Sequence, residues 1–133
     1  MLHQSVTLQT THRCQLIDLA SHMHDFLCLT PPNGLLVVFC PHTTAGVTIN
    51  EKADPDVSRD ILQHLAKLVP SDSSFLHSEG NSDAHIKTLL TGVSVQIPVV
   101  HGTPLLGTWQ TLFFCEYDGP RTRHIEFTFF PSS

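Results

Sequence analysis

Cationic residues are scarce in this 133-residue chain, which has seven Lys and Arg against twelve Asp and Glu and a net charge of -5. A general nucleic-acid or membrane-surface binder needs a basic face to meet phosphates, so the charge balance argues against both classes. Long apolar runs are also lacking. The longest one, Leu35 to Cys40, is far shorter than the roughly 20 residues that cross a bilayer. We therefore expect neither a nucleic-acid nor a membrane partner.

Signals for export and for disulfide formation are lacking as well. The amino terminus has neither a basic start nor an apolar stretch, so no signal peptide is visible. The four cysteines form no CxxC pair and no short zinc-type spacing. A chain of this length does not need disulfides to hold a core. We predict free thiols and a cytoplasmic protein.

Common catalytic fingerprints are missing too. The chain contains no GxSxG, GxxxxGKS/T, GxGxxG or HExxH, which removes the usual hydrolase, nucleotide-binding and metalloprotease signatures. What it does contain is histidine: ten residues, more than all Lys and Arg together. Because histidine changes its charge near neutral pH and is the commonest metal ligand, its placement directs the search for a site.

Apolar content and periodicity predict a single α+β domain over residues 1–133, built on a mostly antiparallel sheet or sandwich with two to three short helices. Hydrophobic residues make up 41% of the chain, and no repeat or charge block divides it. Asp54 and Pro55 are typical of a helix start, and Pro70 of its end. The expected strands are 4–10, 13–18, 35–40, 93–99, 108–117 and 123–129, and the expected helices are 21–27, 55–69 and 82–91.

The densest polar cluster is a run in which alternate positions carry His77, Glu79, Asn81, Asp83 and His85. Alternate side chains of an extended segment point the same way, so at least the first four can converge. His85 falls in the first turn of the next helix, where the dipole favours the neutral form that binds metal. Imidazole with carboxylate suits zinc or another divalent ion. Alternatively, the run is a polar loop in which Asp83 only caps a helix.

A second polar cluster follows the apolar strand at 35–40. His42 stands just beyond the end of this strand, where side chains often line a cleft. Thr43, Thr44 and Gly46 offer small donors and a flexible backbone, which suit phosphate or another oxyanion. The alternative is a turn that carries a surface histidine.

A third cluster lies between the last two predicted strands. The Asp-Gly-Pro run at 118–120 predicts a tight turn that joins them. Arg121 and Arg123 occupy alternate positions after it, so both guanidinium groups can face one way and hold one anion. Alternatively, they are surface strand residues paired with Glu116 or Glu126.

Together these segments resemble the YjbQ-like family of small proteins, described as secondary thiamine-phosphate synthases. The resemblance covers nearly the whole chain, in order and with compact spacing. Four motifs carry it: Pro41-His42-Thr43-Thr44-Ala45 with Asn50-Glu51, His77-x-Glu79-x-Asn81-x-Asp83-x-His85-x-Lys87, Leu106-Gly107-Thr108-Trp109-Gln110, and Glu116-x-Asp118-Gly119-Pro120-Arg121-x-Arg123.

The resemblance implies a homotrimer and a weak thiamine-phosphate synthase activity on small phosphorylated substrates, in which a thiazole phosphate nitrogen displaces pyrophosphate from a pyrimidine carrier. A divalent ion, Mg²⁺ or Zn²⁺, is expected because it neutralises the charge on the leaving pyrophosphate. His42, His77 and His85 would hold the metal or act as acid and base. Glu79 and Asp83 would orient them or complete the metal shell. The implied substrate-binding residues are Thr43, Thr44, Asn50, Glu51, Asn81, Trp109, Gln110, Arg121 and Arg123.

Two other functions stay open at this point. One is a metal- or anion-binding trimer without turnover of its own, in which synthesis is a side reaction. The other is a purely structural trimer whose polar motifs hold the subunits together. A metal with an open position and an anion pocket serve binding and catalysis alike, so chemistry alone does not separate the enzyme from the binding module.

Overall fold

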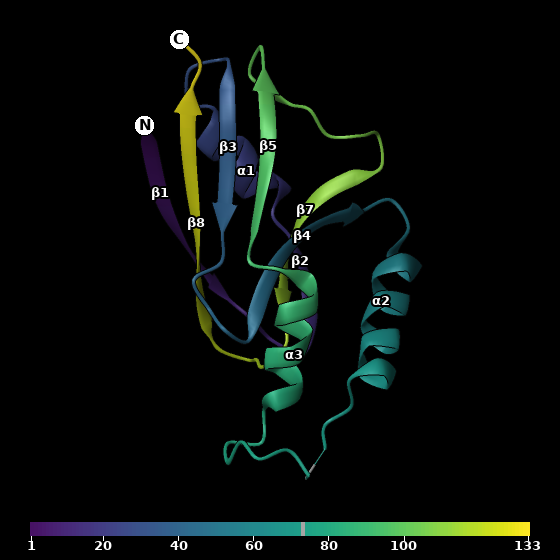
Figure 1. Cartoon of the computed structure of the whole chain (residues 1–133). Coiled ribbons are helices and arrows are strands. Elements are labelled where there is room, and N and C mark those ends of the chain that lie inside the picture. The colour runs from purple at the N-terminus through teal and green to yellow at the C-terminus, as the bar shows by residue number, and fades with distance from the viewer. Residues whose placement is uncertain (73) are drawn as a thin grey trace.

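The computed structural model describes residues 1–72 and 74–133, and Figure 1 shows their arrangement. The helices in this part of the chain are α1 (Ala20–Leu27), α2 (Pro55–Leu68) and α3 (Ser82–Thr91). The strands are β1 (Leu2–Gln9), β2 (Gln15–Asp18), β3 (Gly34–Phe39), β4 (Ala45–Glu51), β5 (Ser94–Val100), β6 (Thr103–Pro104), β7 (Gln110–Glu116) and β8 (Thr122–Pro131).

The strands form two antiparallel sheets. One has the order β1-β8-β3-β5-β6 and the other the order β2-β7-β4. This arrangement confirms the predicted α+β class with mostly antiparallel pairing. Two strands, β4 and β6, were not predicted. Strand β6 has only two residues, which carry no detectable periodicity. The prediction for the Asp-Gly-Pro turn holds in part: it joins β7 to β8, but these two strands lie in different sheets.

The core fills the space between the two sheets and α1. Apolar residues from β3, β5 and β8 of one sheet meet residues from β4 and β7 of the other. Helix α1 covers the same face of the five-stranded sheet, and its Phe26 ring lies 5.6 Å from the ring of Phe127 in β8. Figure 1 shows α1 behind this sheet and α3 and α2 to the side of the smaller one. Fully buried members include Leu36, Val38, Val47, Ile97, Leu112, Phe114, Ile125, Phe127 and Phe129.

Strand β7 has large apolar groups on both faces because both faces are covered within the chain. Leu112 and Phe114 enter the main core. Phe113 and Cys115 face the other way, into a smaller cluster that includes Ala84 of α3. Burial of a strand on both faces requires apolar residues at consecutive positions, as at 112–115.

Two glycines allow the close approaches that shape one end of the fold. A Cβ on Gly46 would lie 2.4 Å from the carbonyl oxygen of Gly92, so this position brings β4 against the end of α3. A Cβ on Gly119 would lie 2.3 Å from the carbonyl oxygen of His12. The turn between β7 and β8 therefore packs directly on the segment that follows β1.

Helix α2 begins as the sequence predicts but is only partly packed. Asp54 is the N-cap and accepts from the N–H of Asp56 at 2.9 Å, with Pro55 in the first turn. None of its residues is fully buried. Its last apolar residue, Leu68, is 61% exposed. Among the described residues, no helix has both the length and the apolar character needed to cross a membrane.

Candidate functional site

A polar cavity of about 440 Å³ opens where three segments meet at one end of the fold. These segments are the loop after β3, the run leading into α3, and the turn between β7 and β8. The pairing of Ala45 with Glu116 places the first and third side by side, and the N–H of Tyr117 donates to the carbonyl of Thr44 at 3.2 Å. The cavity is lined by Pro41, His42, Thr43, Thr44, His77, Glu79, Asn81, His85, Arg121 and Arg123.

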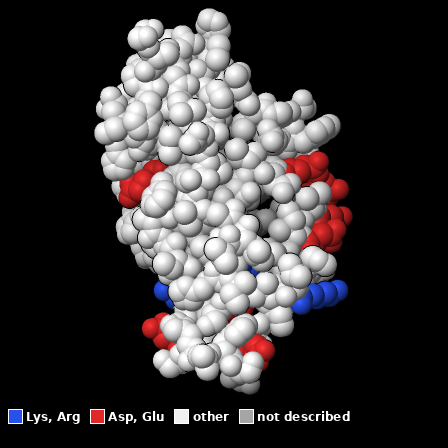
Figure 2. Space-filling model, viewed as in Figure 1, with Lys and Arg blue, Asp and Glu red and all other residues white. Residues whose placement is uncertain are grey.

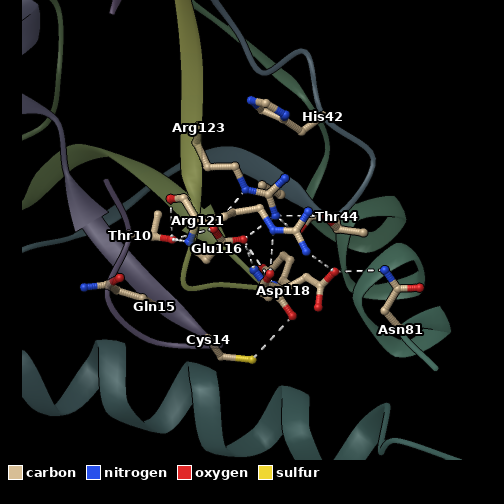
Figure 3. A network of polar contacts seen from close by, with 12 residues as sticks. Thr10, Cys14, Gln15, His42, Thr44, Asn81, Glu116, Asp118, Arg121 and Arg123 are labelled. Atoms are coloured by element: carbon tan, nitrogen blue, oxygen red, sulfur yellow. Dashed lines mark hydrogen bonds and ion pairs between the residues drawn. The ribbon is translucent and has the colours of Figure 1, made fainter. Parts of the chain in front are cut away.

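The floor of the cavity is a buried ion pair between Arg123 and Glu116 (Figure 3). The Arg123 side chain is 3% exposed and that of Glu116 is fully enclosed. Arg123 donates from Nε to Glu116 at 2.9 Å and from Nη2 to its second oxygen and to Oγ1 of Thr44, the last at 2.8 Å. The hydroxyl of Thr10 also donates to Glu116, at 2.8 Å. Both charges are thus paired and hydrogen-bonded, which burial of an ion pair requires.

Glu116 stays ionised despite its burial. Loss of water by itself raises the pKa of a carboxyl group. Here the donors around Glu116, chiefly Arg123, the N–H of Asp118 and the hydroxyl of Thr10, outweigh burial, and the net pKa of Glu116 is lowered. The carboxylate therefore remains a fixed negative partner that holds the Arg123 guanidinium in place.

Arg121 forms the outer wall of the cavity and folds back on the turn that precedes it. Its Nε donates to the carbonyl of Asp118 at 2.8 Å and its Nη2 to the Asp118 carboxylate at 2.9 Å. Asn81 donates to the same carboxylate at 2.8 Å and ties the run before α3 to this turn. Among the described residues, Nη1 of Arg121 and Nη1 of Arg123 have no protein acceptor. These are the donors left to meet a ligand.

His42 is held by the backbone of β8. The N–H of His124 donates to Nε2 of His42 at 2.9 Å, and the two rings stack with their centroids 6.3 Å apart. Burial lowers the pKa of His42, and the nearby Arg123 charge lowers it further. The ring is therefore neutral near pH 7. Nε2 also lies 3.1 Å from the carbonyl oxygen of His124, so the backbone of this one residue meets the ring through both its N–H and its carbonyl.

His77 and His85 meet at the mouth of the cavity. Their rings lie edge to face with centroids 5.4 Å apart, and Glu79 lines the same cavity. The donor types suit a divalent ion. However, within residues 1–72 and 74–133 no three His, Cys, Asp or Glu side chains lie close enough together to hold one. Since the backbone occupies Nε2 of His42, only Nδ1 of that ring is left to coordinate, and the three-histidine metal site stays a prediction.

Asp83 does not line the cavity. It is buried in the first turn of α3, where both of its oxygens accept from Arg13, at 2.9 and 3.0 Å, and one also accepts from Lys87 at 3.2 Å. The Arg13 guanidinium is the main reason that the pKa of Asp83 falls to about 2. The prediction of an extended run is wrong: residues 78–80 form a turn and a bend, in which Gly80 has a φ of +76°. Helix α3 then begins at Ser82, and Asp83 in its first turn pairs with Arg13 and Lys87 instead of joining His77 and Glu79.

Four predicted binding residues lie at the other end of the smaller sheet. The pairs Asn50 with Thr111 and Glu51 with Gln110 close this end. The pair of Ala45 with Glu116 closes the end beside the cavity. Six residues of extended strand separate the two ends by on the order of 20 Å. Residues left outside the cavity of this chain are Asn50, Glu51, Trp109 and Gln110; Trp109 is 61% exposed and precedes β7.

Some residues that shape the site carry no sequence signal of their own. Thr10 and Arg13 lie in the connection between β1 and β2, more than 60 positions from their partners. Only the fold brings them to Glu116 and Asp83. The run from 116 to 123 does hold a signal, since two acids are followed by two arginines at a fixed spacing. That spacing reflects ion pairs within the turn region as much as ligand binding.

Asp83 is expected to act on stability. Replacing it by Asn leaves Lys87 buried without a counter-charge and should lower the free energy of unfolding at pH 7 by about 2 to 4 kcal/mol. Because the folded pKa lies below the unfolded one, the wild-type advantage is complete above about pH 4 and disappears as the pH falls towards 2. Urea unfolding at several pH values measures this difference. Asp56→Asn, which breaks an exposed ion pair in the first turn of α2, should cost under about 1 kcal/mol. Equal stability of wild type and Asp83→Asn would contradict the assignment.

His42 is expected to titrate below the ordinary histidine pKa, because burial and the nearby Arg123 charge disfavour its protonated form. Because the unfolded chain takes up this proton more readily than the folded one, the contribution of His42 to stability is lost as the pH falls below about 6.5. Long-range ¹H–¹⁵N correlation spectra report both the pKa and the tautomer. A His42 pKa at or above the ordinary histidine value would contradict this expectation.

The comparisons with known proteins agree on one family. The model of the family described as UPF0047 protein YjbQ-like matches residues 4–132. A UPF0047 protein of Methanocaldococcus jannaschii is 48% identical over 117 residues, which span 87% of this chain and 85% of the relative. The UPF0047 protein YugU of Bacillus subtilis is 43% identical over 122 residues, or 90% of this chain and 92% of its own length.

Solved structures show the same fold over nearly the whole chain. An uncharacterised YjbQ/UPF0047 protein of Clostridium acetobutylicum matches with a TM-score of 0.93 and 46% identity, covering 96% of this chain and 99% of that one. A protein of Sulfolobus solfataricus, described as YbjQ-like and of unknown function, matches with a TM-score of 0.93 and 27% identity, covering 98% and 97% of the two chains. This chain therefore belongs to the UPF0047 family of YjbQ-like proteins.

Proposed function

We propose that the chain is an enzyme of small phosphorylated substrates, and that it joins a pyrimidine pyrophosphate to a thiazole phosphate with release of pyrophosphate. The supporting observation is the polar cavity, in which two arginines, a threonine-bearing loop and three histidines from distant parts of the chain converge. Donors of this kind in one hollow suit phosphate groups better than neutral or cationic ligands.

The two arginines are set in position before a ligand arrives. Nε and Nη2 of both side chains are bound to Glu116, Thr44 or Asp118, so neither guanidinium is free to rotate. Their Nη1 atoms then present two donors at fixed places, beside the His42 ring that the backbone of His124 holds. Fixed donors bind an anion without the entropic cost of ordering long side chains, and they stabilise charge as it develops.

The proposed reaction needs this positive environment at the leaving group. The thiazole ring nitrogen attacks the methylene carbon of the pyrimidine. A C–N bond forms as the C–O bond to pyrophosphate breaks, and the electron pair of that bond leaves on the pyrophosphate oxygen. Guanidinium groups and neutral N–H donors around this oxygen lower the barrier by stabilising its new charge.

A divalent ion belongs to this proposal. His77 and His85 are the residues that would hold it, with Glu79 in the same cavity. Such an ion supplies further neutralisation of pyrophosphate charge when bound. Magnesium ordinarily takes few protein ligands and completes its shell with phosphate oxygens and water, so two side chains are compatible with an ion carried in with the substrate.

Loss of Arg121 should weaken anion binding selectively. Arg121→Gln removes a charged donor from the cavity wall, and pyrophosphate affinity should fall about 10- to 100-fold, as measured by isothermal titration calorimetry. Arg59→Gln is the matched control, because Arg59 forms the same i,i+3 ion pair with an aspartate on exposed α2. Its affinity should equal that of wild type. Equal losses in the two variants would mean that the cavity is not the binding site.

Activity measurements on wild type and on cavity variants distinguish an enzyme from a binding module. Product formation from the two precursors should require a divalent ion and should fall in Arg121→Gln, His77→Ala and His85→Ala. Pyrophosphate binding without product in wild type, with and without Mg²⁺ or Zn²⁺, supports the module and contradicts the enzyme. Unchanged activity in both histidine variants would remove these residues from the catalytic set.

We also propose that the chain assembles as a homotrimer, as the family resemblance implies. The outer face of the five-stranded sheet supports assembly: Phe39, Val100 and Phe130 are each at least 40% exposed on it or at its end. Figure 2 shows few charged residues over this part of the molecule. Exposed apolar groups that lie together favour a protein contact.

Light scattering is expected to give a mass three times the 14.7 kDa of the chain. Phe130→Glu places a charge on the outer face without disturbing the core, so it should shift the protein to smaller species. A wild-type mass of one chain would contradict the trimer. A trimer unaffected by Phe130→Glu would place its contacts on another face.

A further inference from the structure

A second cavity, of about 400 Å³, lies beside the polar one and has mostly apolar walls. His42, Thr43 and His85 line both cavities. The other walls come from the end of α3 and from the two residues that connect it to β5. The two hollows are therefore neighbouring compartments with a shared wall, and each has a volume within the range of roughly 300 to 1,000 Å³ typical of small-molecule sites. The remaining lining residues of the apolar cavity are Thr88, Leu89, Gly92 and Val93.

One residue in the wall of the apolar cavity carries an unmet hydrogen-bonding group. Thr88 is 6% exposed, and its buried Oγ1 has no partner among the described residues. A helical threonine ordinarily bonds to the carbonyl three or four residues earlier. Thr91, on the same helix, does so with the carbonyl of Lys87 at 2.9 Å. A buried hydroxyl without a partner destabilises the free protein, and Thr88 brings such a group to the wall of this cavity.

We propose that the apolar cavity is the subsite for the organic part of a phosphate ester whose phosphate occupies the polar cavity. The inference rests on the proposed function, because it takes phosphate binding by Arg121 and Arg123 as its starting point. The mostly carbon walls select a compact apolar body, and the Thr88 hydroxyl selects one ring nitrogen, amino or hydroxyl group on it. The shared wall at His42 and His85 requires only a short linker between this body and the phosphate.

Three probes separate the two compartments: inorganic phosphate, benzyl phosphate and 3-pyridylmethyl phosphate. In wild type, both esters should bind about tenfold more tightly than inorganic phosphate, because a ring leaves water for an apolar wall. Thr88→Val should weaken the pyridyl ester about three- to tenfold and leave inorganic phosphate and the benzyl ester unchanged. The same variant should raise the Tm of the free protein, because it removes an unpaired buried hydroxyl.

Thr91→Val is the matched control on α3. It removes a hydroxyl that is already bonded within the protein, so it should lower the Tm and leave the relative affinities of the three probes as in wild type. Leu89→Ser provides a second test that does not threaten folding, because Leu89 is 80% exposed. It should weaken both esters and leave inorganic phosphate unchanged.

The outcomes distinguish the inference from the function on which it rests. Failure of wild type to bind inorganic phosphate overturns the proposed function and, with it, the subsite. Binding of inorganic phosphate with no gain for either ester overturns the subsite alone, as it would if a second copy of the chain covers this cavity. A pyridyl ester that binds Thr88→Val as tightly as wild type also overturns the subsite.

Discussion

The ion pair between Glu116 and Arg123 connects the two sheets at the point where the polar cavity opens. Glu116 ends β7 in the smaller sheet, and Arg123 is the second residue of β8 in the larger one. Thr10, beyond β1, and Thr44, before β4, supply the remaining hydrogen bonds. Four segments thus depend on one enclosed pair. Removing either charge leaves the other buried without compensation, which destabilises a protein far more than loss of a surface pair.

The contacts that join the two sheets also position the hydrogen-bond donors of the cavity. The pair that fixes the start of β8 also holds the Arg123 guanidinium in the cavity wall, and the backbone of His124, one residue later, holds the His42 ring. A second ion pair, between Arg121 and Asp118, fixes the Arg121 side chain in the outer wall of the cavity. The Asp118 carboxylate also accepts a hydrogen bond from Asn81. Placement of the donors is therefore a consequence of how the sheets are joined. A rigid scaffold of this kind is what a preorganised anion site needs.

The sequence predicted the elements well because their signals are local. The proline and aspartate at the start of α2 and the alternation in β5 and β8 need no tertiary information. The convergence of His42, His77 and His85 on one cavity was predicted only from spacing and resemblance. The surroundings of Asp83 could not be predicted, because the run before α3 is a turn and not an extended segment, and because the ion pair with Arg13 spans 70 positions. Asn50 and Trp109 are residue types that often occur in binding sites. However, the register of β4 on β7 places them at the end of the smaller sheet that is remote from the polar cavity.

The two arginines differ in what they contribute, and burial is the reason. The charge of Arg123 is enclosed and balanced by Glu116, so it adds little to the electrostatic potential of the cavity. Arg123 contributes instead a hydrogen-bond donor held in a fixed position. Arg121 is half exposed and shares the carboxylate of Asp118 with Asn81, so part of its charge remains available to an incoming anion. Water screens a pair of this exposure, and an anion that displaces that water strengthens its own interaction with Arg121. Affinity in this cavity should therefore depend on how completely the ligand fills it, which favours a substrate large enough to exclude solvent from both walls.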